Sequence, residues 1–200
     1  MTTSVAERRD TFVKALHALQ AGAGSGIPKR QSECRQALAR LRRSLTGPRQ
    51  QTAAYEIVFR HDPPESEQEV WLLVAGLFAT HPQPARRGHR SLGASMRALR
   101  EKRGDAAARR FEQLLGRERD VLPHHLRQIV RLLASDDIPV NYSSLLDDLV
   151  VLMGDGYRDN PAHRIRLRWA RDFHSPDYTA TASGTTASTD DTTTSSPTPA

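Results

Sequence analysis

The sequence predicts an all-α fold, a compact bundle of about eight or nine short helices, and three observations support this prediction. Apolar residues recur three or four positions apart through most of the first 174 residues, which is the spacing of one helical face. Clusters of glycine and proline separate these stretches, as they do at helix ends. No run of strand length alternates β-branched with polar residues, so no sheet is expected.

Four helices are predicted in the first half of the chain. The fourth follows the break at 61–64 and begins with a capping box, in which Ser66 and Glu69 would each bond the other's backbone N–H. It continues through Val70–Ala79, which is apolar on every side, so we expect a buried central rod. Cys34 lies on an apolar stripe and is expected to be a buried structural thiol. The first three helices are marked by Phe12, Leu16 and Leu19, by Cys34, Leu38, Leu41 and Leu45, and by a weaker pattern over about 50–59.

Five further helices are predicted after a basic loop at 86–90. Four of them have a polar residue at the expected start, and all five have an apolar stripe behind it. Leu92, Met96 and Leu99 form the first of these stripes, and Gly93 is expected to permit close packing. The expected starts are Ser91, Asp105, Val121, Asn141 or Ser143, and Asn160 followed by Pro161 at the first helical position.

The helical body is expected to span residues 1–178, with two packed lobes of roughly 1–104 and 105–178 as one way of dividing it. From about Thr179 the sequence consists mainly of Thr, Ser, Ala and Pro, with no large apolar residue after Tyr178. Such a segment cannot offset its ordering entropy by burial. We therefore expect a disordered tail at 179–200.

The charge of the chain is concentrated in the helical body. The 200 residues include 29 Lys+Arg and 23 Asp+Glu, a formal net charge of +6. The segment from Ser175 onward has no basic residue and holds three of the acidic ones, so residues 1–174 carry 29 basic and 20 acidic side chains, or +9. Three of the basic residues are lysines, which leaves 26 arginines. Guanidinium groups pair with phosphate oxygens in bidentate geometry, so this excess favours a phosphate-bearing partner.

Several classes of protein are not expected. A single cysteine excludes an intramolecular disulfide and a zinc site built from cysteines. The longest apolar run, Val70–Ala79, is shorter than the roughly 20 residues that span a bilayer. Charged residues precede any apolar stretch at the N-terminus, so no signal peptide is expected. A cytoplasmic protein without a membrane partner is the resulting expectation.

The arginines recur at helical spacing. Arg127 and Arg131 are one turn apart and so share a helix face. A face with several arginines can hold a polyphosphate backbone, although a single row is more often an ordinary solvated face. Several rows in one basic body favour nucleic-acid binding. The other rows are Arg35 with Arg42, Arg109 with Arg110, Arg117 with Arg119, and Arg164 with Arg168 and Arg171.

Catalytic chemistry has little support in the sequence. Adjacent histidines such as His124 and His125 point about 100° apart on a helix and do not readily share a metal ion. The acidic pairs at 136–137 and 147–148 are better explained as a turn and as helix-start residues than as a two-metal site. Neither a nucleophile motif nor a phosphate-binding loop is present. We therefore expect no enzyme activity, no cofactor and no metal.

A series of short motifs follows one order along the chain: Leu41–Leu45, Phe59–His61, Trp71–Pro82, Ser91–Gly93, Arg109–Leu115, Leu126–Leu133, Ile138–Tyr142, Leu145–Leu149 and Trp169–Phe173. In this order the motifs resemble the CasB family, the small subunit of the type I-E CRISPR Cascade complex. The resemblance covers about residues 8–178.

This resemblance implies a helical, non-catalytic subunit that lies in the complex as two copies. Its implied partners are the other Cascade subunits, a second copy of itself, the crRNA-guided target DNA and the displaced strand, whose R-loop it would stabilise. Because the exchange of duplex for heteroduplex is nearly balanced in energy, contacts to the backbone can decide whether the open state persists. The arginines expected to contact phosphate are Arg42, Arg43, Arg97, Arg109, Arg110, Arg117, Arg119, Arg127 and Arg131.

Three other functions stay open at this point. The chain could be a helical scaffold whose arginines bind acidic protein neighbours. It could be a helix-turn-helix regulator, because 121–149 holds two predicted helices joined by a short turn. The least favoured function is a metal-dependent nuclease that uses Asp147.

Overall fold

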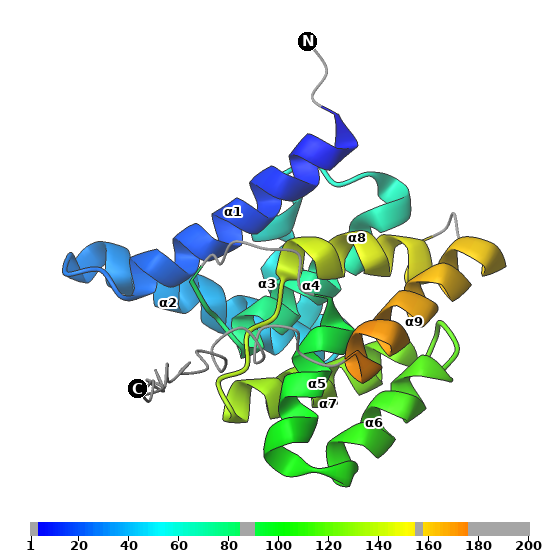
Figure 1. Cartoon of the computed structure of the whole chain (residues 1–200). Coiled ribbons are helices and arrows are strands. Elements are labelled where there is room, and N and C mark those ends of the chain that lie inside the picture. Colours follow the sequence, from blue (N-terminus) through cyan, green and yellow to red (C-terminus); the bar gives the residue numbers. More distant parts are fainter. Residues whose placement is uncertain (1–3, 85–90, 155–157, 176–200) are drawn as a thin grey trace, which may run out of the picture.

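The computed structural model describes residues 4–84, 91–154 and 158–175, and these ranges confirm the all-α prediction. They form nine α-helices and two 3₁₀ turns, without a strand among them (Figure 1). The basic loop at 86–90 and the tail predicted to be disordered at 179–200 lie outside the described residues. The α-helices are α1 (Val5–Ala23), α2 (Pro28–Arg43), α3 (Pro48–Phe59), α4 (Gln68–Thr80), α5 (Leu92–Arg103), α6 (Asp105–Leu115), α7 (Leu122–Ser135), α8 (Tyr142–Met153) and α9 (Asp159–His174), and the 3₁₀ turns are η1 (Ser44–Thr46) and η2 (Glu65–Glu67).

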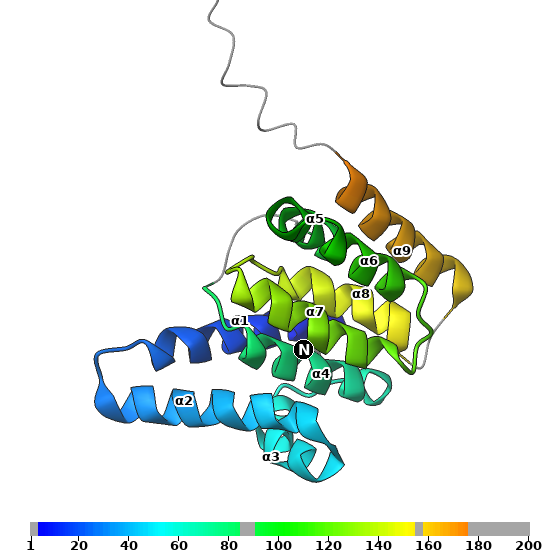
Figure 2. The same cartoon turned by 90° about the horizontal axis from the view of Figure 1, so that it is seen from below.

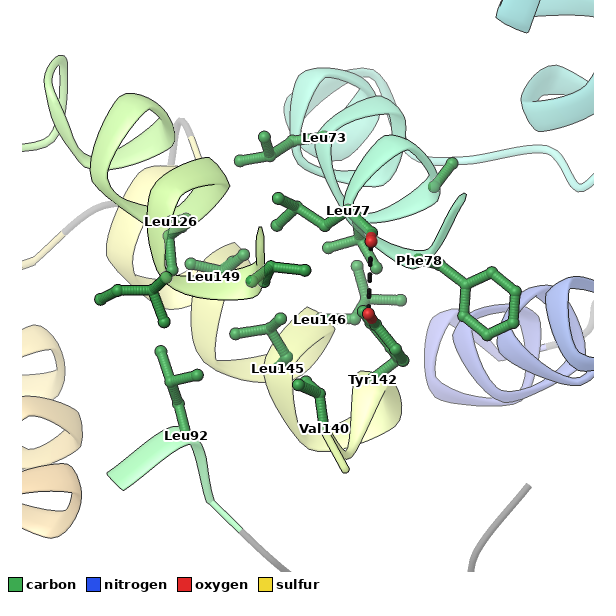
Figure 3. Close-up of a cluster of buried hydrophobic side chains, with 14 of the residues drawn as sticks. Leu73, Leu77, Phe78, Leu92, Leu126, Val140, Tyr142, Leu145, Leu146 and Leu149 are labelled. Atoms are coloured by element: carbon green, nitrogen blue, oxygen red, sulfur yellow. Dashed lines mark hydrogen bonds between the residues drawn. The ribbon is translucent and has the colours of Figure 1, made fainter. Parts of the chain in front are cut away.

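Helix α4 is the central rod that the sequence predicts. Every residue from Val70 to Ala79 is buried. Its neighbours are α2 and α3 on one side and α7 and α8 on the other (Figure 2). Figure 3 shows Leu73 and Leu77 of α4 pointing toward the leucines of α8, with Leu126 of α7 beside them. One continuous apolar cluster runs from Phe12 in α1 to Phe173 in α9.

Polar groups fix the end of α4 to the start of α8. The Tyr142 hydroxyl lies 3.2 Å from the carbonyl oxygens of both Leu77 and His81 (Figure 3). Gln83 bonds Val140 through both halves of its amide, and His81 Nε2 lies 2.8 Å from the Ile138 oxygen. A carbonyl that is buried at a helix end without a hydrogen-bond partner costs free energy. These bonds therefore explain why polar residues are buried here.

Helices α5 and α9 pack unusually closely, as the sequence predicts for Gly93. A Cβ atom at Gly93 would lie 2.0 Å from the carbonyl oxygen of Trp169, so only glycine allows this distance between the helices. Ser91 accepts the N–H of Ala94 and caps α5, which is the role expected for it. Its hydroxyl also donates to Asp172 Oδ2 at 2.6 Å and so connects the start of α5 to α9.

A network of ion pairs connects α1, η2, α4 and α8. Arg9 donates to both oxygens of Glu67, at 2.9 and 2.5 Å, and to Asp147 Oδ1 at 3.1 Å. The Trp71 indole N–H donates to the same Glu67 carboxylate at 3.0 Å. Burial by itself would raise the pKa of Glu67, but the bonds from Arg9 and Trp71 outweigh it and lower that pKa.

Three predicted helix starts are wrong by one or two residues. Ser66 does not cap α4, because the chain first makes the 3₁₀ turn η2 and Glu67 turns its carboxylate to Arg9 and Trp71. Asp105 is the first residue of α6 rather than its N-cap. The N-cap is Gly104, whose positive φ interrupts the helix between α5 and α6. Helix α9 begins at Asp159, before Asn160 and Pro161. Asn141 caps α8 as predicted, by accepting the N–H of Ser144 at 3.1 Å.

Cys34 is only partly buried, so the prediction of a buried thiol is wrong. The hairpin of α1 and α2 extends beyond the other helices (Figure 2). The Sγ atom of Cys34 packs against Gly22 of α1, where a Cβ would lie 2.4 Å away.

Candidate nucleic-acid interface

Helix α7 is amphipathic and presents two of the predicted arginines beside its buried stripe. Leu122, Leu126 and Ile129 are buried, which directs the polar residues of α7 outward. Arg131 is exposed, and Arg127, one turn earlier, is partly buried. Burial and the nearby charge of Arg131 lower the pKa of Arg127. The two guanidinium groups are therefore close enough to act on the same ligand.

Arg127 lies in a groove between α7 and the end of α2. The groove holds about 200 Å³, and Ser44 and Leu45 line it opposite Pro123 and Arg127. The Nε atom of Arg127 is buried and has no hydrogen-bond partner in the described part of the chain. A buried donor without an acceptor costs free energy that a bound acceptor would recover. Glu69 lines the same groove, without an ion pair to Arg127 within the described residues.

The loop that joins α6 to α7 adds a third charge to this region. Arg117 is exposed, and its positive charge contributes, after burial, to lowering the pKa of His125 in the first turn of α7. Arg166 of α9 donates to the Arg117 carbonyl oxygen at 3.0 Å and so holds the loop against α9. Arg119, in the same loop, is partly buried. The predicted row at 117–119 therefore lies in the loop before α7, near His125 in its first turn, while Arg127 and Arg131 lie further along the same helix.

Arg42 and Arg43 end α2 and directly precede Ser44 of the groove. Arg42 Nε donates to the Ala79 carbonyl oxygen at 2.9 Å, so Arg42 also closes the C-terminal turn of α4. Arg43 is exposed and donates within its own helix to Ala39 at 3.4 Å. Helix α4 separates α2 from α7 (Figure 2), and Ser44, the residue after Arg43, lines the groove together with Arg127.

Arg109 and Arg110 are both exposed on α6. Phe111, the next residue, is buried and packs against Phe173 of α9 with ring centroids 4.6 Å apart. Helix α6 lies beside α7 on the side away from α4 (Figure 2). The row at 109–110 therefore belongs to a helix adjacent to the α7 arginines.

Arg97 has different surroundings from the other predicted arginines. Its side chain is 13% exposed, and Nη1 donates to the carbonyl oxygens of Asp172 and Ser175 at 3.2 and 2.7 Å. Those are carbonyls of the last turn of α9, where a cation is favoured by the helix dipole. Arg97 thus has a structural role at the end of α9, on a different part of the molecule from α7.

The described carboxylates do not assemble a metal site. In residues 4–84, 91–154 and 158–175, no three His, Cys, Asp or Glu side chains are placed to hold an ion. Asp147 pairs with Arg9 at 3.1 Å and Asp136 with Arg103 at 2.6 Å. Asp148 is buried, bonded to Arg168, and accepts the indole N–H of Trp169 at 2.6 Å. These carboxylates act as structural ion-pair partners.

The burial of α8 argues against a helix-turn-helix regulator. In that motif the second helix must expose several side chains to the major groove. Helix α8 buries Tyr142, Leu145, Leu146 and Leu149 in the core (Figure 3), and its fully exposed positions are Ser143 and Asp147. The described helices also include none that is long and apolar enough to cross a membrane.

Comparisons with known proteins identify the fold. The chain is similar to a chain of a "CRISPR RNA-guided surveillance complex", with a TM-score of 0.67 and 22% identity, covering 86% of this chain and 94% of that one. It is similar to CasB from Thermobifida fusca, with a TM-score of 0.66, 24% identity and coverage of 88% and 100%. It is also similar to M. ruber CasB, with a TM-score of 0.62, 28% identity and coverage of 83% and 92%. Comparison with curated proteins gives no match.

A sequence model of one family matches most of the chain. The model for CRISPR-associated protein Cse2 covers residues 37–174, which runs from the middle of α2 to the end of α9. The match includes α7 and the arginine rows beside it, and it confirms the resemblance predicted from the motifs. The chain belongs to the Cse2 family of CRISPR-associated proteins.

Proposed function

We propose that this protein is the non-catalytic small subunit of a Cascade surveillance complex and stabilises the R-loop by contacting nucleic-acid phosphates. Its partners in this role are the other Cascade subunits, a second copy of itself, the crRNA-guided target DNA and the displaced strand. Membership of the Cse2 family and the likeness to a chain of an RNA-guided surveillance complex support this assignment.

The arginines around α7 carry the proposal. The unpartnered Nε of Arg127 lies in a groove that Ser44 lines, directly after Arg43, with Arg131 one turn away. Phosphate oxygens would supply the missing acceptor, and contacts of this kind position a backbone without reading its sequence. The proposed contact residues are Arg42, Arg43, Arg109, Arg110, Arg117, Arg119, Arg127 and Arg131. Arg97 is not among them, because it lies in a separate region at the end of α9.

The test is the stability of the R-loop in a complex assembled with the variant Arg127→Glu/Arg131→Glu. We expect the lifetime of the R-loop to fall by about tenfold or more, since two attractive contacts to phosphates become repulsive. Lys14→Glu/Arg60→Glu makes the same charge change on α1 and beyond α3, at exposed residues that pair with Asp10 and Glu56. Equal lifetimes for the two variants would contradict the proposal.

A scaffold that binds acidic neighbours is the second candidate, because Arg127 could equally donate to a carboxylate. That function predicts that Arg127→Glu/Arg131→Glu fails to assemble with the other subunits. It also predicts that the free wild-type chain has negligible affinity for DNA or RNA. Assembly measured by size-exclusion chromatography separates this outcome from loss of the R-loop alone.

A further inference from the structure

A second cavity lies away from the groove at Arg127, between α5, the start of α8 and the end of α9. It holds about 600 Å³, within the range of small-ligand sites. Ala94 is its one apolar residue; the others are Ser91, Arg97, Ser144, Arg168, Arg171, Asp172 and Ser175. Three arginines and three serines thus line this cavity, which is open to solvent.

The charged side chains that line the cavity already form hydrogen bonds or ion pairs within the fold. Asp172 accepts the Ser91 hydroxyl at 2.6 Å on Oδ2, and Oδ1 lies 3.3 Å from both Nε and Nη2 of Arg171. Arg97 is held by the carbonyls at the end of α9. Arg168 bonds the buried Asp148 through Nη2. Even with Asp148 counted, arginines outnumber carboxylates at this cavity by three to two.

Two of these arginines keep donors for a ligand. Arg168 and Arg171 are three residues apart, and so lie on one face of α9. A guanidinium has five N–H donors, and the ion pairs just described use only part of them. The side chains are 42% and 73% exposed, so solvent and ligands reach both. Ser144 adds a hydroxyl from α8, and its own backbone N–H is already bonded to Asn141.

We propose that this cavity, which we name the α5–α9 pocket, binds a phosphate group of a nucleic-acid backbone. The pocket rests on the proposed function and extends it, because it adds Arg168, Arg171 and Ser144 as a second contact region. Arginines and hydroxyls are typical phosphate ligands. A protein partner would instead be expected to bury aromatic or aliphatic anchors, for which this wall offers little surface.

Arg171→Gln is the variant that tests the pocket. Arg168 is not suitable, because its removal would leave the buried Asp148 without its charged partner. Arg60→Gln is the matched control, since Arg60 is 61% exposed and also lies in an ion pair with a residue of its own segment. Ser144→Ala removes a ligand from a different helix while leaving the capped backbone N–H in place.

The first measurement is the affinity of the full chain for a fluorescent oligothymidylate at several salt concentrations. We expect Arg171→Gln to weaken binding by about tenfold, as for a lost charged hydrogen bond. The slope of log affinity against log salt should fall by about 0.7, the value for one contact on a single strand. Arg60→Gln should match the wild type, and Ser144→Ala should weaken binding by a smaller factor.

The two tryptophans give an independent reading of the same pocket by NMR. The Trp169 indole N–H bonds Asp148, which in turn bonds Arg168 in the wall. The Trp71 indole bonds Glu67, which is not part of the pocket. On adding inorganic phosphate or oligothymidylate, we expect the Trp169 indole signal to move and the Trp71 signal to stay.

Several outcomes would overturn the pocket, and they differ from failure of the proposed function. If Arg171→Gln binds like the wild type while Arg127→Gln/Arg131→Gln binds weakly, the pocket is wrong and the function stands. If poly-glutamate shifts Trp169 as strongly as oligothymidylate does, the pocket accepts acidic proteins and the phosphate assignment is wrong. If the wild type binds no oligothymidylate at all, both proposals fail.

Discussion

Arginine has two roles in this protein, and only the surroundings of each guanidinium distinguish them. Arg9 and Arg97 are largely enclosed and hold carboxylates or helix carbonyls within the fold. Arg109, Arg110 and Arg131 are exposed on the surfaces of α6 and α7. The sequence analysis grouped Arg97 with Arg109, Arg110 and Arg131 as phosphate contacts, because the sequence alone does not show which guanidinium groups the fold encloses.

At the residue scale, Glu67 should make the free energy of unfolding depend on pH in the acidic range. Its pKa is lowered in the fold from the ordinary 4.5, so its contribution is present above pH 4.5 and is lost as the pH falls through the folded value. We expect Glu67→Gln to lower the free energy of unfolding at pH 7 by about 1–3 kcal/mol, since Arg9 loses the carboxylate that it binds through two nitrogens and keeps only Asp147 as an ionised partner. Chemical denaturation across the acidic range should show this difference shrinking below pH 4.5.

Glu65→Gln is the control for that measurement. Glu65 lies in the same 3₁₀ turn and is exposed, so its loss should leave stability nearly unchanged at every pH. A difference between wild type and Glu67→Gln that stays constant down to pH 3 would show that Glu67 is not the titrating group.

At the scale of elements, periodicity predicted every helix but not every helix end. Apolar stripes survive folding because burial of one face is what holds a helix in place. The start of α4 was missed because Glu67 bonds Arg9, a residue 58 positions away, in preference to a local cap. Such a long-range partner leaves no local signal in the sequence. The α9 row at 168–171 was seen as a pattern, but its place in a cavity depends on α5 and α8.

Gly93, at the contact of α5 and α9, should tolerate substitution poorly. Gly93→Ala would place a methyl group 2.0 Å from the Trp169 oxygen, so we expect a loss of about 1–3 kcal/mol in the free energy of unfolding. Thermal or chemical unfolding measures it directly.

Gly116→Ala serves as the comparison for Gly93→Ala. The nearest atom to a Cβ at Gly116 is the Glu112 oxygen at 3.8 Å, an ordinary contact. Similar stability for the two variants would mean that the helices can separate without cost, and that the close approach is not what Gly93 provides.

At the scale of the whole molecule, arginine side chains are concentrated in two regions. Arg127 and Arg131 lie on α7, the row at 117–119 lies in the loop before it, and the row at 109–110 lies on the neighbouring α6. The row at 42–43 lies at the end of α2, directly before Ser44 of the groove. The α5–α9 pocket lies elsewhere, at the end of α9. The sequence showed a body with a net charge of +9, but spacing along a chain could not show which helices lie side by side. Only the packing of α2, α4, α7 and α6 in that order does so.

The central claim, that the α7 arginines hold nucleic-acid phosphates, is tested most directly by the salt dependence of oligothymidylate binding. The measurement compares the wild-type chain with Arg127→Gln/Arg131→Gln, using fluorescence anisotropy over a series of salt concentrations. The claim predicts weaker binding by the variant and a slope of log affinity against log salt that is smaller by about 1.4, two contacts at 0.7 each. An unchanged affinity with an unchanged slope would contradict it.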